Sequence, residues 1–183
     1  MRKVIAAINI SIDGFCDHTA GLPDEEIHQH YSDLLGEGDV MLYGRTTYQL
    51  MEYWRTVLEN PSEEKSMNEF ARAIDKIPKI VFSHTLKTVD WETARLATRK
   101  LEEEVLELKQ QTGKDIFVGS PSLISALTNL NLIDEFQLCV HPVVVGAGLQ
   151  LFKNLDDKLI FRLSRTKTFS GGAIILYYEP KTK

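Results

Sequence analysis

The order of apolar and polar positions predicts alternating strands and helices over the first two-thirds of the chain. Residues 3–12 alternate and then fill with β-branched side chains, which is typical of a buried strand. Residues 24–35 carry apolar side chains at helical spacing, between Pro23 and Gly36, and are therefore predicted as a helix. By the same reasoning, further strands are expected at residues 40–43, 79–83, 94–98 and 115–118, and further helices at residues 46–54, 64–77, 99–111 and 123–130.

In the last third of the chain, strand follows strand. Residues 135–145, 159–169 and 173–179 are predicted strands, with residues 171–172 as the hairpin turn between the final two. Alternating strands and helices indicate parallel strands with crossovers, whereas hairpins indicate antiparallel strands. The sequence therefore predicts an α/β fold: a mixed, mostly parallel sheet with helices on both faces and antiparallel C-terminal strands. We expect residues 1–183 to form a single domain.

The composition is typical of a soluble globular protein, with 43% hydrophobic and 26% charged residues. A net charge of −5 argues against a surface for nucleic acid or an anionic membrane. The sequence has no apolar run long enough for a membrane span, and its N-terminus is too short and too alternating for a signal peptide. A cytoplasmic location is expected.

The cysteines and histidines do not form a recognisable metal motif. Cys16 and Cys139 lie far apart without a CxxC pattern, and the five histidines make no HExxH. No metal site is therefore expected. Cys139 is expected to be a small core or semi-buried residue, and His141, beside Pro142, a structural one.

Three of the predicted strands end in loops that carry small or hydroxyl-bearing residues. These loops contain Gly44, Arg45, Thr46 and Thr47; Ser83 and His84; and Gly119, Ser120, Pro121 and Ser122. Ligands of open α/β sheets bind at the carboxyl ends of the strands, and helix N-termini attract anions. Because Arg45 offers a planar cation suited to phosphate, the pattern favours a crevice for an extended, phosphate-bearing molecule.

Each loop also has a plainer interpretation. Gly44 followed by a capping Thr46 or Thr47 is an ordinary helix start, and Ser83 with His84 is an ordinary turn. The residues alone leave these alternatives open.

Several segments, taken in order, resemble the reductase domain of the bacterial riboflavin-biosynthesis bifunctional deaminase-reductase, a relative of dihydrofolate reductase. The segments are SIDG, LYGRTTY, IVFSHT, IFVGSPSLISAL and LIDEFQLCVHPVVVGAGLQLF. The resemblance covers nearly the whole chain, from Lys3 to Pro180, and the last segment is its most specific part. Because no deaminase domain precedes these segments, a stand-alone reductase-like domain is expected.

The resemblance implies an NADPH-dependent reductase. By match to the family, Gly44, Arg45, Thr46 and Thr47 would hold the cofactor's phosphates and adenosine side, Ser83 and His84 would lie near the adenosine 2′-phosphate, and Gly119, Ser120, Pro121, Ser122 and Leu123 would take the pyrophosphate and nicotinamide. Members of this family are commonly homodimers, so a two-fold interface built from the late strands is also implied.

On the substrate side, the resemblance points to the first strand and the first helix. Ala7 and Asn9 are candidate lining residues, and Trp54 is a candidate for a planar-ligand pocket or, alternatively, for the core. Glu25 resembles the pterin-binding carboxylate of dihydrofolate reductases, although an acid at a helix start also favours the helix dipole. Asp13 belongs to a motif that the family shares, with turn formation as its alternative role.

Two hypotheses about function follow. The first is an NADPH-dependent reductase of a small planar substrate that is pterin-, pyrimidine- or folate-like. The second is a catalytically silent nucleotide-binding or regulatory protein on the same fold, because a fold does not fix a function. A purely structural dimer would bind no cofactor. Folate itself is in doubt, since the cofactor loop reads Gly-Ser-Pro and the residues for a folate tail cannot be located.

Overall fold

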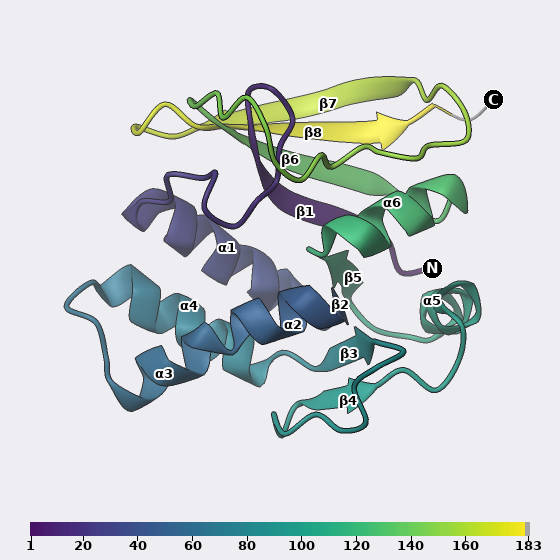
Figure 1. Cartoon of the computed structure of the whole chain (residues 1–183), viewed down its shortest axis with the longest axis horizontal. Coiled ribbons are helices and arrows are strands. Elements are labelled where there is room, and N and C mark those ends of the chain that lie inside the picture. The colour runs from purple at the N-terminus through teal and green to yellow at the C-terminus, as the bar shows by residue number, and fades with distance from the viewer. Residues whose placement is uncertain (182–183) are drawn as a thin grey trace. The chain divides into compact units, whose positions relative to one another are not determined.

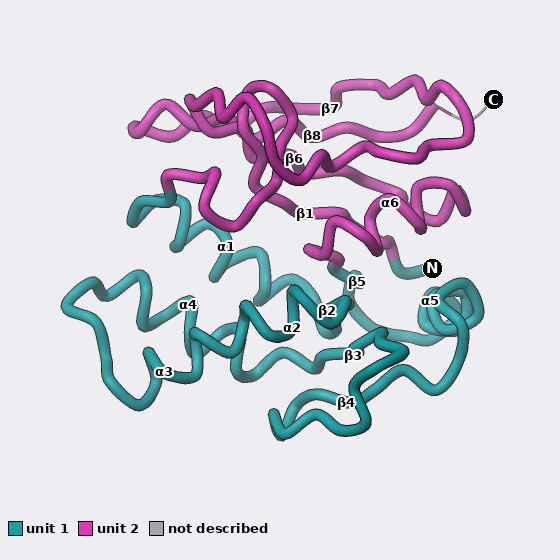
Figure 2. Tube along the Cα trace, in the orientation of Figure 1, with its two compact units in different colours: residues 1–2, 23–117 teal, residues 3–22, 118–183 magenta. Residues whose placement is uncertain are grey.

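The computed structural model describes residues 1–181, which contain eight strands and six helices (Figure 1). The chain divides into two units, which Figure 2 shows in different colours. Unit 1 contains residues 1–2 and 23–117, and unit 2 contains residues 3–22 and the chain from residue 118 onward. That residues 1–183 behave as one domain stays a prediction.

Unit 1 holds most of the helices. Its elements are α1 (Glu25–Glu37), β2 (Gly38–Gly44), α2 (Arg45–Met51), α3 (Tyr53–Glu59), α4 (Lys65–Lys76), β3 (Lys79–Phe82), β4 (Ala94–Leu96), α5 (Leu101–Gln110) and β5 (Asp115–Val118), of which Val118 is counted with unit 2. β2 pairs with β3, and β3 with β4, in parallel. Gly44 is opposite Phe82, so β2 and β3 end at the same level and their following loops start side by side.

The helix α1 forms where the apolar spacing predicts it. Asp24 is its N-cap, and the carboxylate accepts a hydrogen bond from the backbone N–H of Ile27 at 2.9 Å. Ile27, Leu34 and Leu35 are buried, and α1 lies beside α4 (Figure 1). The prediction that Gly36 ends the helix is wrong, because α1 continues to Glu37 and its C-cap is Gly38.

The predicted helix over residues 46–54 is also wrong in detail. Gly44 occupies the N-cap position of α2 and no side chain caps it, so neither Thr46 nor Thr47 has the predicted capping role. The helix starts one residue early because the strand runs directly into it. After Met51 the backbone tightens, and the N–H of Glu52 bonds to carbonyls of the preceding turn before α3 begins.

Unit 2 contains β1 (Val4–Ser11), α6 (Pro121–Asn129), β6 (Glu135–His141), β7 (Phe161–Thr168) and β8 (Ile174–Pro180). Its strands lie in the order β1-β6-β8-β7. β1 pairs with β6 in parallel, whereas β8 pairs antiparallel with both β6 and β7. The predicted fold class, a mixed and mostly parallel sheet with helices and antiparallel C-terminal strands, is confirmed.

Two features of the late strands follow from glycine and proline. The β7–β8 hairpin closes at the predicted glycines, where Gly172 has a φ of 87°. The strand expected over residues 135–145 is shorter than predicted and ends at His141, because Pro142 has no N–H to donate. Cys139 is fully buried in β6, which confirms the prediction that it is a core residue.

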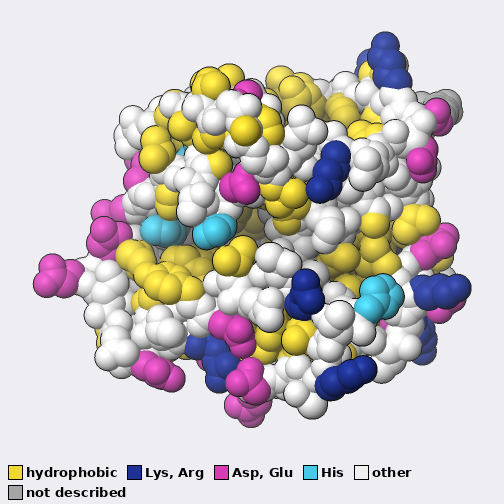
Figure 3. Space-filling model, in the orientation of Figure 1, with side chains coloured by type: hydrophobic (Ala, Val, Ile, Leu, Met, Phe, Trp, Pro, Cys, Tyr) yellow, Lys and Arg dark blue, Asp and Glu magenta, His cyan; other side chains and the backbone are white. Residues whose placement is uncertain are grey.

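The distribution of charged side chains on the surface agrees with the modest net negative charge of the sequence. On the face drawn in Figure 3, acidic and basic side chains are interspersed and no extended basic patch is visible. None of the helices among residues 1–181 has the length and apolar character needed to cross a membrane.

Candidate functional site

Arg45 joins the two neighbouring loops of unit 1. It is the first residue of α2, directly after β2, and its guanidinium Nη1 donates a hydrogen bond to Thr85 Oγ1 at 3.0 Å. Thr85 lies in the loop that follows β3. Because β2 and β3 end at the same level, Arg45 spans from one strand end to the other. The result is an exposed cation beside hydroxyl groups, an arrangement suited to a phosphate.

Ser83 forms the turn at the end of β3. Its Oγ accepts hydrogen bonds from the backbone N–H groups of Thr85 at 3.1 Å and Leu86 at 2.9 Å. These bonds are those of a serine turn, so the plainer interpretation of this segment has direct geometric support. His84 is exposed at the tip of the same turn. Ser83 therefore shapes the loop that presents Thr85 and His84.

A polar network holds α2 and α3 in place. Tyr48 is buried on α2, and its hydroxyl donates to Asp90 Oδ1 at 3.2 Å, which also accepts from Arg55 Nη1 at 3.1 Å. The hydrogen bonds from Tyr48 and Arg55 lower the pKa of Asp90. Thr46 is exposed and Thr47 is half-buried in the first turn of α2, beside Arg45. The network thus fixes the helix whose first residues carry the predicted cofactor contacts.

The predicted cofactor residues of unit 2 form the start of α6. Ser120 is the N-cap residue and is buried, Pro121 is the first helical residue, and Ser122 is exposed. Leu123 is buried and anchors the helix to the core. Gly119 passes so close to β1 that a Cβ on it would lie 3.4 Å from the carbonyl oxygen of Ala7. The loop therefore brings backbone N–H groups and β1 together.

Ala7 and Asn9 lie on one face of β1. They are the half-exposed residues of this strand, and each of the others is buried. Because they are two residues apart, their side chains share a face. That face of β1 is therefore partly exposed at Ala7 and Asn9, and Gly119 lies beside Ala7.

Asp13 holds two loops of unit 2 together. Its Oδ1 accepts from the Ser11 hydroxyl at 2.6 Å, and its Oδ2 accepts from the backbone N–H of Gly146 at 2.8 Å. The hydrogen bond from Ser11 is the main cause of a lowered pKa for Asp13. The carboxylate is therefore ionised at neutral pH, and its geometry favours the turn-forming role. A role for Asp13 in catalysis stays a prediction.

Glu25 and Trp54 occupy different environments in unit 1. Glu25 is exposed in the first turn of α1, where an acid also favours the helix dipole. Trp54 is half-buried in a cluster of rings, 4.6 Å from the centroid of Phe70 and 5.7 Å from that of His28, both edge to face. Desolvation lowers the pKa of His28, so its imidazole is neutral at pH 7. The cluster gives Trp54 a packing role and leaves part of its ring accessible.

Two residues were not predicted as part of the site. Thr85 accepts a hydrogen bond from Arg45, which identifies it as part of the site. Its hydroxyl group in the sequence FSHT was the feature from which this role could have been predicted. His141 is fully buried, and its Nε2 lies 2.9 Å from Asn9 Oδ1. It was predicted to be structural; a pairing with Asn9 needs the β1–β6 register, which a single sequence does not provide. Residues 1–181 hold no group of three or more His, Cys, Asp or Glu placed to bind a metal ion.

Comparison with known proteins places these features in context. The family model of the RibD C-terminal domain matches residues 2–175. The uncharacterized protein YyaP of Bacillus subtilis (strain 168) is 34% identical over 182 residues, covering 97% of this chain and 95% of YyaP.

Solved structures show the same fold. A riboflavin biosynthesis protein from Shewanella sp. PV-4 aligns with a TM-score of 0.73 at 20% identity over the full length of both chains. A pyrimidine reductase-like protein from Corynebacterium diphtheriae aligns with a TM-score of 0.69 at 16% identity, over 100% of this chain and 93% of that one. At these identities the likeness concerns the fold.

Proposed function

Because this chain belongs to the RibD C-terminal domain family, we propose that it is an NADPH-dependent reductase of a small planar substrate. The observation that carries the proposal is the hydrogen bond from Arg45 to Thr85, which joins the loops after two parallel strands. This bond holds the Arg45 guanidinium next to hydroxyl groups at the carboxyl ends of the strands, where α/β proteins bind ligands. We assign this cluster to the adenosine 2′-phosphate, the group that distinguishes NADPH from NADH.

The remaining cofactor residues fit their proposed roles in each unit. Gly44, Thr46 and Thr47 flank Arg45 and would contact the adenosine side, with Ser83 and His84 nearby in the β3 loop. In unit 2, Gly119, Ser120, Pro121, Ser122 and Leu123 form a helix start, whose N–H groups suit a pyrophosphate. A Cβ on Gly119 would lie 3.4 Å from the carbonyl oxygen of Ala7, so this loop runs directly beside β1.

When bound, NADPH supplies the hydride, and the protein orients the nicotinamide against the substrate. We propose that the half-exposed face of Ala7 and Asn9 contacts the substrate, with Trp54 as a further candidate. Glu25 would hydrogen-bond an amino-substituted ring and assist its protonation. Asp13, held by Ser11 and Gly146, would keep its loop in place as an ionised carboxylate.

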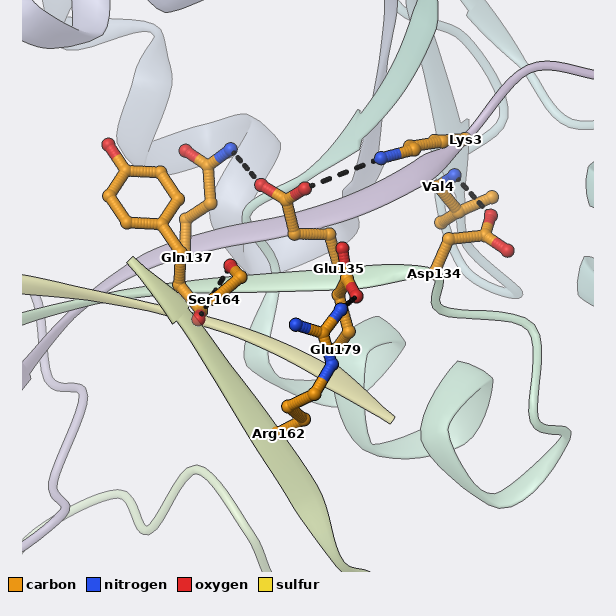
Figure 4. Close-up of polar contacts among 9 residues, drawn as sticks. Lys3, Val4, Asp134, Glu135, Gln137, Arg162, Ser164 and Glu179 are labelled. Carbon is orange, nitrogen blue, oxygen red and sulfur yellow. Dashed lines mark hydrogen bonds and ion pairs between the residues drawn. The ribbon is translucent and has the colours of Figure 1, made fainter. Parts of the chain in front are cut away.

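We also propose that the protein is a homodimer through the late strands of unit 2. Residues 162–168 of β7 are exposed along the whole strand, including Leu163. Figure 4 shows the polar side chains on these strands, among them Gln137, whose Nε2 donates to Glu135 Oε1 at 2.8 Å. The exposed side chain of Leu163 on β7 is the apolar surface that a second copy would cover. The cytoplasmic location stays a prediction.

The alternative is a silent nucleotide-binding or regulatory protein on the same fold. Both proposals expect cofactor affinity, because the Arg45 cluster serves binding and not chemistry. They differ in turnover, since only a reductase oxidises NADPH when a substrate is supplied.

The deciding experiment is a titration of the purified protein with NADPH and with NADH, followed by nicotinamide fluorescence. We expect tighter binding of NADPH than of NADH, after which dihydrofolate, pterins and aminopyrimidines would be screened for NADPH oxidation. No binding of either nucleotide would refute the cofactor assignment. Binding without turnover on any of these substrates would favour the silent alternative.

A further inference from the structure

A cavity of about 330 Å³ in unit 1 is lined by residues of β4, of α5 and of the segment between them. Its walls carry two arginines, two glutamates and an apolar side chain: Arg95, Arg99, Glu104, Glu107 and Leu108. One bound water needs roughly 10–15 Å³, and small-molecule sites in proteins span about 300–1,000 Å³. The cavity therefore has room for a small organic molecule.

Glu104 is a buried carboxylate in the wall of this cavity. It is 3% exposed, although it stands in the first turn of α5 beside two exposed acids, Glu102 and Glu103. Its Oε1 pairs with the Arg95 guanidinium, whereas the buried Oε2 has no hydrogen-bond partner among residues 1–181. The exposed neighbours already complement the helix dipole, so the dipole does not explain the burial of Glu104. Because a buried oxygen without a donor is costly, Glu104 indicates that a donor binds in the cavity.

The two arginines of the cavity differ in how far their charge is already used. Arg95 donates from Nη1 to the carbonyl oxygen of Leu96 at 3.4 Å and pairs through Nη2 with Glu104. Arg99 pairs through Nη1 with Glu107, and both of these side chains are 47% exposed. An ion pair that is open to water is weak, so the other N–H groups of Arg99 can bind a carboxylate. The cavity thus offers an acceptor at Glu104 and donors at Arg99.

We propose that this cavity binds an α-amino acid with an aliphatic side chain. The ammonium group donates to Oε2 of Glu104, and the carboxylate accepts from Arg99. Leu108, which is 8% exposed, lines the same cavity and provides an apolar surface for the aliphatic side chain. Two positive and two negative side chains in the wall balance, which suits a zwitterion better than a simple cation or anion.

This site is independent of the proposed function. The residues assigned above to NADPH and to the substrate are not among those that line the cavity. Binding of an amino acid can therefore be tested whether or not the protein is a reductase.

The test compares three compounds that differ in their charged groups. L-Leucine carries both groups, isoamylamine lacks the carboxylate, and 4-methylpentanoate lacks the ammonium group. Binding of each to the full chain would be measured by NMR titration. We expect L-leucine to bind at least about ten-fold more tightly than either analogue, because each analogue loses one charge-assisted interaction.

Two variants connect each charged group of the ligand to one residue. Glu104→Gln keeps an oxygen for Arg95 but places an amide NH₂ at the position of Oε2, so it should bind L-leucine at least about ten-fold more weakly. Arg99→Met removes the donor to the carboxylate, so it should bind L-leucine only as tightly as isoamylamine, with isoamylamine binding unchanged. Glu103→Gln, at the exposed neighbour of Glu104, is the matched control. Thermal unfolding would show whether each variant is folded.

The results separate a ligand site from a cavity that holds water only. No binding of L-leucine to wild type, or equal binding of the three compounds, would overturn the proposal, and a bound water would then be the donor to Glu104. Unchanged L-leucine binding in both variants would overturn it as well. If Glu104→Gln does not fold, Arg99→Met and the three compounds decide the question, because Arg99 is exposed and its replacement leaves the buried pair of Arg95 and Glu104 intact.

Discussion

Single residues with charged side chains carry the candidate chemistry, and their partners show what each one can do. Arg45 donates to a hydroxyl and stays exposed, so a phosphate can compete for it. Asp13 accepts from a hydroxyl and two backbone N–H groups, so its charge is already used by its own loops. Both residues lie near strand ends. Of the two, Arg45 is the exposed cation that an external anion can bind, whereas the Asp13 carboxylate is engaged within the chain.

Replacing Arg45 tests the cofactor assignment directly. Arg45→Ala should weaken NADPH binding by roughly 10- to 100-fold, since a hydrogen-bonded charge contributes about 1.5–3 kcal/mol. NADH binding should change by less than about three-fold, because it lacks the 2′-phosphate. Titration of both nucleotides checks this, with Arg72→Ala on the exposed surface of α4 as the control. Equal losses for both would move Arg45 to the pyrophosphate.

Replacing Glu25 tests the proposed substrate contact. Glu25→Gln should lower the rate of NADPH oxidation by roughly 100-fold, because the amide cannot supply a proton. The affinity for NADPH should stay within error of wild type, since Glu25 is assigned to the substrate. Glu26→Gln is the matched control on the same exposed turn. A rate equal to that of wild type would remove Glu25 from the mechanism.

At the scale of elements, α1 shows how local signals and packing define a helix. Its start is local, because Asp24 caps the N–H of Ile27. Its end is set by packing, since a Cβ on Gly38 would overlap the ring of Phe117. The chain therefore needs a glycine where α1 turns into β2, two residues beyond the glycine that looked like the stop signal.

The cap of α1 gives a prediction about stability. Asp24→Ala should lower the free energy of unfolding by about 1 kcal/mol, because a helix N–H loses its acceptor. For a chain of this length, that corresponds to a fall in Tm of roughly 2–4 °C. Thermal unfolding with Glu26→Ala as the control checks it. Equal shifts for both variants would assign the effect to the helix dipole instead of the cap.

At the scale of the whole molecule, a buried lysine makes stability depend on pH. Lys79 is 1% exposed, and its Nζ donates to the carbonyl of Ile77 and to the Thr93 hydroxyl, each at 2.8 Å, and lies 4.1 Å from the Trp91 ring centroid. Desolvation lowers its pKa from 10.5 to about 8. Between these two values the unfolded chain binds more protons than the folded one, so stability due to this group rises with pH.

The Lys79→Met variant isolates this contribution. The difference in unfolding free energy between wild type and variant should grow in favour of wild type by on the order of 2–3 kcal/mol from pH 8 to pH 10.5. The effect is absent below pH 8, where Lys79 is charged in both states. Urea unfolding at several pH values measures it, with the exposed Lys76→Met as control. A pH-independent difference would contradict the burial argument.

The proposed homodimer is tested at the same scale. Leu163 is 48% exposed on β7, so Leu163→Glu should leave folding intact and should convert a dimer into a monomer. Light scattering after gel filtration gives the mass. Leu106→Glu, at a residue 41% exposed on α5 in unit 1, is the control and should stay dimeric. A wild-type mass of one chain would refute the dimer.

Most of the fold was predictable from the sequence because its signals are local. Period-2 and helical spacing gave the strands and helices, and the hairpin glycines gave the turn between the last two strands, whereas the end of β6 at His141, before Pro142, was missed. The errors lie where neighbours in space override local chemistry. Gly36 and the threonines after Gly44 carry ordinary stop and cap signals, yet packing and a directly continuing strand decide those positions.

For the candidate site too, some features follow from the sequence alone and others depend on which residues are neighbours in space. The sequence by itself determined the α/β class, the resemblance to a reductase family, and which loops carry phosphate-binding residue types, because these depend on composition and order along the chain. Only the tertiary structure decided that Arg45 donates to Thr85, that Asp13 accepts a hydrogen bond from Gly146, and that His141 hydrogen-bonds to Asn9. Those pairs lie 40, 133 and 132 residues apart, and strand register, which no local pattern encodes, brings them together.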